Sequence, residues 1–190
     1  MVGESGKQVF CQAAGYAQLE PVRIPARTDT VYDLASLTKV VATTTAVFLL
    51  RDSGAIRLDQ SAADFIPLGA LGNVTLAQLL RHTAGFTASN RFYKLVSTTD
   101  ELISWYASEG FDVAPGNRYQ YDDAGFIILG KVIEVAALQP LDDFCRREIF
   151  RPLAMHDTAF NPGPELAARC AATELCAWRK LTRTPLPSLC

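Results

Sequence analysis

The chain has 190 residues, which is long enough for one domain with a real core or for two small lobes. With 49% hydrophobic and 20% charged residues, it has the composition of a globular protein and can bury enough apolar surface to fold. The formal net charge is −2 and no basic cluster stands out, so nucleic acid is not an expected partner.

Targeting and redox signals are sparse. Residues 1–7 contain no apolar segment or cleavage site, and the longest apolar stretch, residues 40–50, is too short to span a bilayer. We therefore expect a cytoplasmic protein without a membrane segment, whereas a leader missing from this sequence would imply a periplasmic or secreted protein. The five cysteines include no C-x-x-C pair, which predicts reduced thiols rather than a disulfide framework or a zinc site.

Strand and turn signals dominate the first third of the chain, apart from one apolar helix. In chain order they predict a turn at residues 6–7, a strand over 7–16, a loop over 20–30, a short extended piece over 31–34, a buried helix over 36–51 and a turn-rich segment over 59–67.

Helical patterns and caps dominate the rest of the chain. The predicted helices cover residues 76–81 after the cap Thr75, 100–108 after Thr98 or Thr99, 124–137 after Asp123, and 140–150, which opens on a proline. A turn is predicted at residues 114–117, and no regular element is expected from about residue 170 onward.

Ser36 and Lys39 open the most apolar helix, in the tetrapeptide Ser36-Leu37-Thr38-Lys39. This spacing is just under one helical turn, which puts both side chains on one face. A serine hydroxyl needs a base to become a nucleophile, and burial at the positive end of the helix dipole should lower the pKa of Lys39 so that it can serve as one. The alternative is a helix cap followed by a solvated lysine, but a lysine one turn into so apolar a helix is costly to leave charged and unpaired.

Tyr121, Asp122 and Asp123 lie between the predicted turn at 114–117 and the helix at 124–137. A loop that enters a helix can aim Tyr121 into a cleft, where its phenol would relay a proton to a leaving group. The alternative is a core tyrosine with Asp123 as a plain helix cap. Capping and catalysis are compatible for Asp123, so this segment alone does not decide between the two interpretations.

Together these segments resemble the serine β-lactamase and penicillin-binding family, which includes class C β-lactamases, D-alanyl-D-alanine carboxypeptidases and family VIII esterases. The similar segments are residues 36–39 with the apolar run after them, 79–86 (LLRHTAGF), 119–126 (YQYDDAGF) and 152–155 (PLAM), within roughly residues 6–178. The resemblance implies that Ser36 is the nucleophile, Lys39 its base and Tyr121 the assisting phenol. It also implies a substrate-binding role for Asp123, and a reaction with no metal or cofactor.

Two departures from the family pattern matter. Asp122 and Asp123 stand where the family has Ser and Asn, and the charge of Asp123 would favour protonated Lys39 and weaken it as a base. No Lys-Thr-Gly or His-x-Gly triplet follows Tyr121, although in the family that strand binds the substrate carboxylate and supplies the second oxyanion N–H. Losing one such donor typically costs about 10²–10³ in rate. We therefore expect a truncated or frameshifted product, with a tail from Lys180 onward that no longer resembles the family.

The expected fold class is α+β. It is a partial serine β-lactamase and DD-peptidase fold, with a helical lobe over about 61–149 and an incomplete antiparallel sheet lobe over about 1–60 and 150–190. The implied function is acyl transfer from a small-molecule substrate, which is a β-lactam, a D-Ala-D-Ala peptide or a small ester. The alternative is an impaired or inactive remnant of the family that is non-enzymatic or only binds. The oligomeric state stays open.

Two weaker signals have simpler explanations. The segment Gly3-Glu4-Ser5-Gly6-Lys7 superficially resembles a phosphate loop, but no Ser or Thr follows the lysine and no strand precedes it, so a hairpin turn is favoured. His82 suggests a Ser–His triad, but the sequence has no G-x-S-x-G elbow, and a histidine at the end of a helix is more often structural. Neither His82 nor His156 has a partner at metal-ligand spacing.

Overall fold

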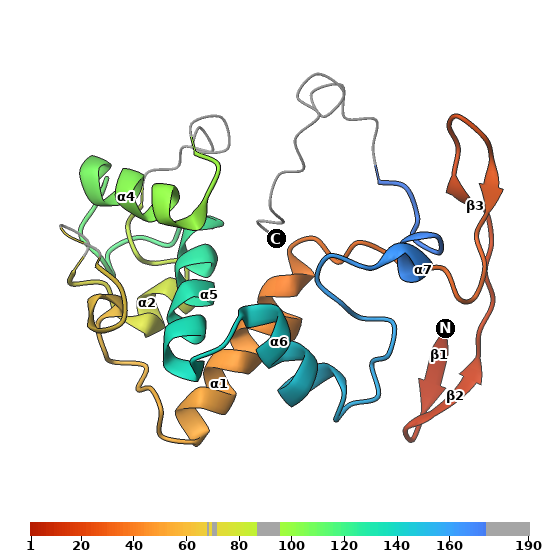
Figure 1. Ribbon diagram of the computed structural model, residues 1–190, viewed down its shortest axis with the longest axis horizontal. Helices are drawn as coiled ribbons and strands as arrows, with labels where there is room; N and C mark the ends of the chain where they lie inside the picture. Colours follow the sequence, from red (N-terminus) through yellow and green to blue (C-terminus); the bar gives the residue numbers. More distant parts are fainter. Residues whose placement is uncertain (68, 70–71, 87–95, 174–190) are drawn as a thin grey trace. The chain divides into compact units, whose positions relative to one another are not determined.

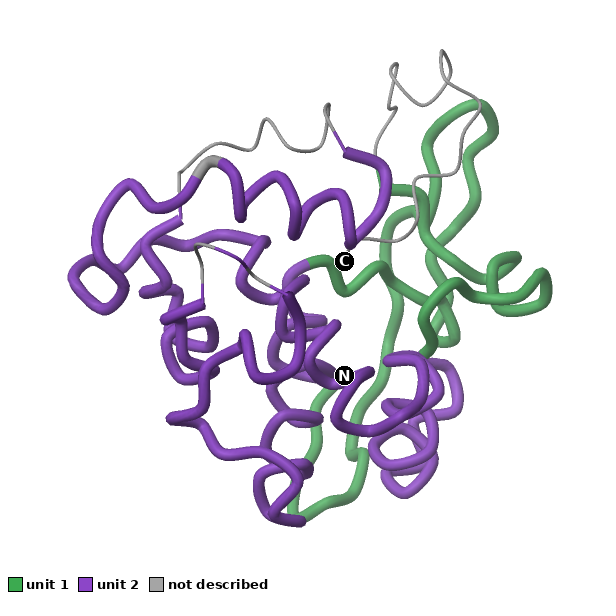
Figure 2. The backbone as a smooth tube through the Cα atoms, turned by 60° about the vertical axis from the view of Figure 1, so that its left-hand side comes forward, with its two compact units in different colours: residues 1–35, 159–185 green, residues 36–158, 186–190 purple. Residues whose placement is uncertain are grey.

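The computed structural model describes residues 1–67, 69, 72–86 and 96–173 (Figure 1). The chain forms two compact units, which are coloured separately in Figure 2. Of the described residues, 1–35 and 159–173 form one unit, and those between 36 and 158 form the other. The combination of helices with small antiparallel sheets confirms the predicted α+β class, while the altered tail expected from Lys180 onward lies outside the described residues.

The unit that begins at residue 1 contains two small antiparallel sheets. One pairs β1 (Val2–Glu4) with β2 (Lys7–Phe10), and the other pairs β3 (Tyr16–Gln18) with β4 (Ile24–Pro25). Ser5 and Gly6 join β1 to β2 with φ values of 50° and 75°, the left-handed conformation that a tight hairpin requires. The predicted strand over 7–16 is too long, because the chain leaves the sheet after Phe10 and turns at Gly15, and the predicted loop over 20–30 contains β4.

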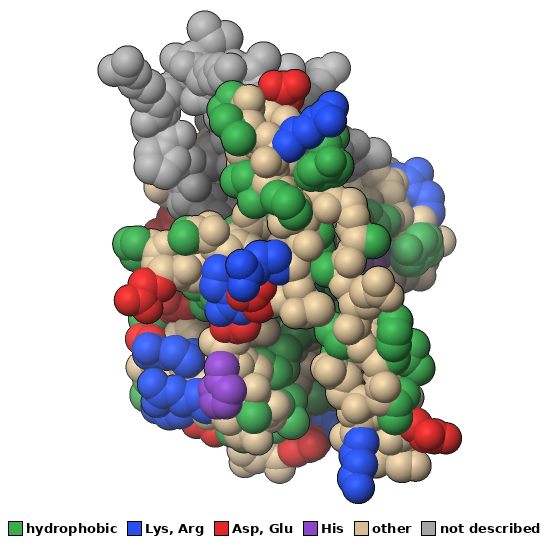
Figure 3. Space-filling view, turned by 90° about the vertical axis from the view of Figure 1, so that its right-hand side faces the viewer, with side chains coloured by type: hydrophobic (Ala, Val, Ile, Leu, Met, Phe, Trp, Pro, Cys, Tyr) green, Lys and Arg blue, Asp and Glu red, His purple; other side chains and the backbone are tan. Residues whose placement is uncertain are grey.

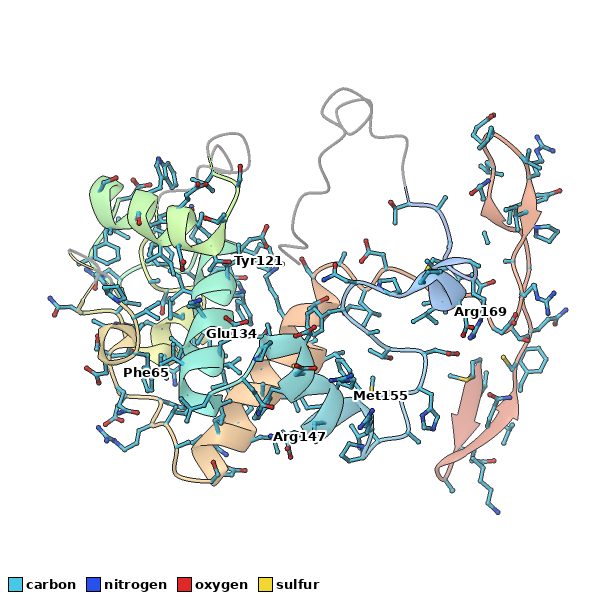
Figure 4. The ribbon with its side chains drawn as sticks, in the orientation of Figure 1. Phe65, Tyr121, Glu134, Arg147, Met155 and Arg169 are labelled. Atoms are coloured by element: carbon cyan, nitrogen blue, oxygen red, sulfur yellow. The ribbon has the colours of Figure 1, made fainter. Side chains whose placement is uncertain are left out.

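Residues 159–173 return to the segment that follows β4. The backbone N–H of Val31 donates to the carbonyl oxygen of Arg169 at 3.0 Å, and Ala171 donates to the oxygen of Val31 at 2.8 Å. The guanidinium of Arg169, labelled in Figure 4, donates to the carbonyl oxygen of Asp29 at 2.9 and 3.1 Å. The short helix α7 (Pro164–Ala167), which begins on a proline, precedes this contact and was not predicted.

The second unit is organised around α5 (Ala124–Ala137), which has the bounds that the sequence predicted. The helices α1 (Thr45–Asp52), α2 (Leu76–Leu80), α4 (Thr99–Glu109) and α6 (Leu141–Cys145) all contact it (Figure 1). Ile128, Leu129 and Ile133 of α5 have no exposed surface, and burying each such side chain contributes about 1.5–3 kcal/mol. α1 packs on α5, and residues 36–60 belong to the same unit as α5, whereas the sequence predicted them as part of the sheet lobe.

Predicted caps and turns are present where local sequence determines them. Thr75 forms a capping box with Gln78 at the start of α2, and the hydroxyl of Thr98 accepts from the backbone N–H of Glu101 at the start of α4. Pro140 precedes α6, and the helix continues as the π-helical segment η4 (Arg146–Phe150). The turn-rich segment at 59–67 contains the 3-10 turn η2 (Ala62–Asp64).

The helix that follows Ser36 is widened in its first turns. Helical residues run from 37 to 52, close to the predicted 36–51, but η1 (Lys39–Thr44) is π-helical before α1 continues the helix. The hydroxyl of Thr45 donates to the carbonyl oxygen of Val40 at 3.0 Å. Threonine hydroxyls that bond to backbone carbonyls compete with regular helix geometry, and π segments are frequent at functional sites.

Hydrophobic side chains remain exposed in both units. Val2, Val9 and Phe10 of the first hairpin are 53–56% exposed. Figure 3 shows hydrophobic side chains next to charged ones on the face that it presents. Leu37 and Val40, on the helix after Ser36, are each 57% exposed.

Across the described ranges, no single helix is long and apolar enough to cross a membrane. The pair formed by α5 and residues 141–150, bent by 75°, reaches the required length and composition only when both helices are taken together.

Candidate active site

A strained turn at Ala35 directly precedes Ser36. The backbone N–H of Ala35 donates to Oδ1 of Asp33 at 2.8 Å, and Ala35 has a φ of 43°, in the left-handed region that alanine rarely adopts. The carbonyl oxygen of Ser36 then accepts from the backbone N–H of Lys39 at 3.1 Å, which closes the first turn of the helix.

Ser36 and Lys39 face each other. Nζ of Lys39 donates to Oγ of Ser36 at 3.2 Å, and the lysine side chain is only 14% exposed. The spacing of the two residues correctly predicted this shared face, and the solvated lysine that was the alternative is not observed. Both residues belong to the helical unit, as do Tyr121 and Asp123.

Asp123 is the closest ionic partner of Lys39. Its Oδ1 accepts from Nζ at 2.6 Å, and the two residues are 84 positions apart in the chain. Burial acts to lower the pKa of Lys39, but hydrogen bonds to Asp123 and Tyr121 and their charges outweigh it and raise this pKa above its usual value of 10.5. The pKa of Lys39 thus departs from the lowering expected from burial and follows the raising effect expected from the charge of Asp123.

Asp122, rather than Asp123, caps α5. Oδ1 of Asp122 accepts from the backbone N–H of Gly125 at 2.6 Å, whereas the side chain of Asp123 makes no capping hydrogen bond. Asp123 is thus at the predicted N-cap position, but the capping hydrogen bond comes from the side chain of its neighbour Asp122. Burial is the main cause that raises the pKa of the Asp122 carboxyl, which is only 12% exposed. With Asp122 at the cap, Asp123 is available to meet Lys39.

Tyr121 lies at the beginning of α5, as Figure 4 shows, and is 51% exposed. It is therefore not the core tyrosine of the alternative interpretation. Nζ of Lys39 lies 5.1 Å from the centroid of its ring and 5.9 Å from that of Phe126, within the range of cation–π attraction. The ring of His82 lies 4.6 Å from the Tyr121 ring and 5.0 Å from the Phe126 ring.

His82 was expected to have a structural role, and nothing in the sequence connected it with Tyr121. His82 lies in the segment 79–86, which resembles the family. Nothing in that segment predicts a contact with residue 121. Phe126 was predicted only as an apolar position of its helix. In the structure the centroid of its ring lies 5.9 Å from Nζ of Lys39. Over the ranges that the structure describes, no cluster of three or more His, Cys, Asp or Glu side chains is arranged to hold a metal ion.

The fold is that of the serine β-lactamases and penicillin-binding proteins. The octameric penicillin-binding protein homologue from Pyrococcus abyssi superposes with a TM-score of 0.77 at 25% identity, over 88% of this chain and 41% of that one. The penicillin-binding protein from Bacillus halodurans superposes with a TM-score of 0.72 at 26% identity, over 85% of this chain and 53% of that one.

Sequence relatives agree with this fold. A protein of Salmonella typhimurium named "Putative D-alanyl-D-alanine carboxypeptidase" is 31% identical over 196 residues, which cover 88% of this chain and 44% of that protein. The sequence model of the beta-lactamase family matches residues 1–187. The chain belongs to the beta-lactamase family, as its motifs suggested, and spans less than half the length of the curated relatives it matches.

Proposed function

We propose that this chain is a serine hydrolase that forms an acyl-enzyme on Ser36, with Lys39 as base and Tyr121 as the assisting phenol. The observation that carries the proposal is the 3.2 Å contact between Nζ of Lys39 and Oγ of Ser36 in a member of the beta-lactamase family. The substrate class is a β-lactam, a D-Ala-D-Ala peptide or a small ester, and the reaction uses no metal or cofactor.

In this mechanism Oγ of Ser36 attacks the carbonyl carbon of the substrate. Its proton passes to neutral Lys39 and reaches the departing amine or alkoxide through the phenol of Tyr121. The backbone N–H of Ser36, at the start of the helix, is suited to stabilise the oxyanion. Water then attacks the serine ester, which releases a carboxylic acid and restores the hydroxyl of Ser36.

Asp123 sets the protonation state from which this reaction starts. Lys39 accepts a proton only when it is neutral, and its raised pKa makes the neutral form scarce at neutral pH. We therefore expect acylation to accelerate as the pH rises through the alkaline range. The substrate-binding role implied for Asp123 competes with this ion pair, since Oδ1 of Asp123 is already engaged by Lys39 at 2.6 Å.

A second candidate function is a binding protein that keeps the family fold without turnover. The same ion pair between Lys39 and Asp123 favours it, because an ammonium held by a carboxylate is a poor base.

Mass spectrometry of the intact protein distinguishes these functions. The chain is incubated with a fluorescent penicillin and, separately, with a phosphonate ester. One adduct per chain, located on Ser36 and absent from Ser36→Ala, supports the hydrolase. Ser104→Ala is the matched control, because the Ser104 hydroxyl only donates to the carbonyl oxygen of Asp100 within α4, and it should label as the wild type does. Folded wild-type protein that takes up neither reagent supports the second function.

A further inference from the structure

His82 holds the backbone on both sides of Tyr121. Its carbonyl oxygen accepts a 2.8 Å hydrogen bond from the backbone N–H of Gln120, and its Nδ1 accepts a 3.3 Å hydrogen bond from the backbone N–H of Asp122. Its ring also packs on the Tyr121 ring, with centroids 4.6 Å apart and planes inclined by 34°. One histidine thus contacts Tyr121 and both of its neighbours in the chain.

His82 is itself firmly placed. Its side chain is only 11% exposed, and its ring packs on Phe126 with centroids 5.0 Å apart. Its φ of 54° is left-handed, so the chain turns sharply after α2. Tyr121, by contrast, is 51% exposed, so its orientation depends on fewer contacts than that of a core residue.

We propose that His82 is a positioning residue that aims the phenol of Tyr121 toward Lys39, an inference that rests on the proposed acyl transfer. Nζ of Lys39 lies 5.1 Å from the centroid of the Tyr121 ring, so a small shift of the phenol changes whether the two groups exchange a proton. A misplacement of about 1 Å can reduce a rate by about 10²-fold. In this role His82 acts through Tyr121 and contacts no substrate.

A double-mutant cycle on the full chain tests this role. The rate at which a fluorophosphonate labels Ser36 is measured for the wild type, His82→Ala, Tyr121→Phe and the double variant. We expect each single change to slow labelling by about tenfold to a hundredfold, and the double variant to be no slower than Tyr121→Phe. Losses that multiply in the double variant, or a His82→Ala rate equal to that of the wild type, would overturn the proposal.

Conservative variants separate positioning from loss of folding. Asparagine tolerates a positive φ, and its side-chain oxygen can replace Nδ1 as the acceptor, so His82→Asn should recover most of the rate that His82→Ala loses. A His82→Asn rate as low as that of His82→Ala counts against the proposal. His156→Ala, which changes an exposed histidine of the same unit, is the control and should label at the wild-type rate.

A readout without chemistry separates this inference from the proposed function. Nuclear Overhauser effects between the Tyr121 ring and the Lys39 side chain, whose Nζ lies 5.1 Å from the ring centroid, report where the ring lies. They should weaken in His82→Ala and stay unchanged in His156→Ala. If the wild type is never labelled on Ser36, the proposed function fails and these effects alone decide: weakened ones support the placement of Tyr121 by His82, and unchanged ones overturn it.

Discussion

Replacing Asp123 with Asn removes the charge that holds Lys39 protonated and keeps the size of the side chain. Oδ1 of Asp123 accepts a 2.6 Å hydrogen bond from Nζ, and the two side chains are 29% and 14% exposed. A hydrogen bond to a charged group contributes about 1.5–3 kcal/mol net, and about 1.4 kcal/mol changes an equilibrium tenfold. We therefore expect about a tenfold to hundredfold larger fraction of neutral Lys39 at a given pH in the variant.

The direction of the pH effect follows from the same pair. Because Lys39 must be neutral to accept the Ser36 proton, labelling of the wild type should rise with pH through the alkaline range. In Asp123→Asn the profile should move toward lower pH, since the pKa of Lys39 loses its main upward cause. The assay is the rate of Ser36 phosphonylation as a function of pH, followed by intact mass.

Asp59→Asn is the matched control, because Asp59 is 78% exposed and pairs only with exposed Arg57 at 3.1 Å. Its pH profile should superimpose on that of the wild type. A profile of Asp123→Asn that also superimposes on the wild type, or that moves to higher pH, would refute the reasoning. NMR titration of the Lys39 amine measures the same change without any reaction.

Further outcomes are expected at three residues. Asp122→Asn keeps an oxygen for the cap of α5 and removes a buried charge. Because the raised carboxyl pKa makes wild-type stability fall as the pH rises above 3.8, this variant should resist urea at neutral pH at least as well as the wild type. Asp122→Ala should instead lose about 1 kcal/mol with the cap. Gly85→Ala should strongly destabilise the fold in urea, since Gly85 has a φ of 82° and its Cβ would lie 2.2 Å from the carbonyl oxygen of Val113. Burial raises the pKa of the Cys145 thiol to about 12, so iodoacetamide should modify Cys145 only after unfolding, as peptide mapping would show.

Local sequence predicted the helices and their starts. The bounds of α5 follow from its apolar periodicity, and the caps Thr75 and Thr98 satisfy N–H groups within a few residues of themselves. The short strands were harder to predict. β1 and β4 have two or three exposed residues each, so they carry little alternation from which a strand can be recognised.

The site was predictable only in part, because some of its contacts are local and others depend on how the helices pack. The contact between Ser36 and Lys39 lies within one turn of one helix, so the spacing alone sets it. Asp123 was expected near Lys39 only through the resemblance to the family, because the contact depends on how α5 packs beside the helix after Ser36 and no local pattern encodes it. For the Lys39 pKa the sequence supported two opposite expectations, because burial lowers this pKa and the carboxylate of Asp123 raises it, and the structure is needed to weigh them.

The two neighbouring carboxylates at the start of α5 have different roles, one in the stability of the fold and one in the chemistry of the site. Oδ1 of Asp122 accepts from the N–H of Gly125, and Oδ2 lies 3.6 Å from Nδ1 of His82, so Asp122→Ala should lower the free energy of unfolding. Asp123 points to Lys39, so replacing it should change the rate at which Ser36 is labelled. Because the backbone rotates between successive residues at a helix start, exchanging the two roles would require a different packing of the helices. Asp122→Asn should therefore keep or raise the resistance to urea, whereas Asp123→Asn, identical in chemistry and adjacent in sequence, should shift the pH profile of Ser36 labelling.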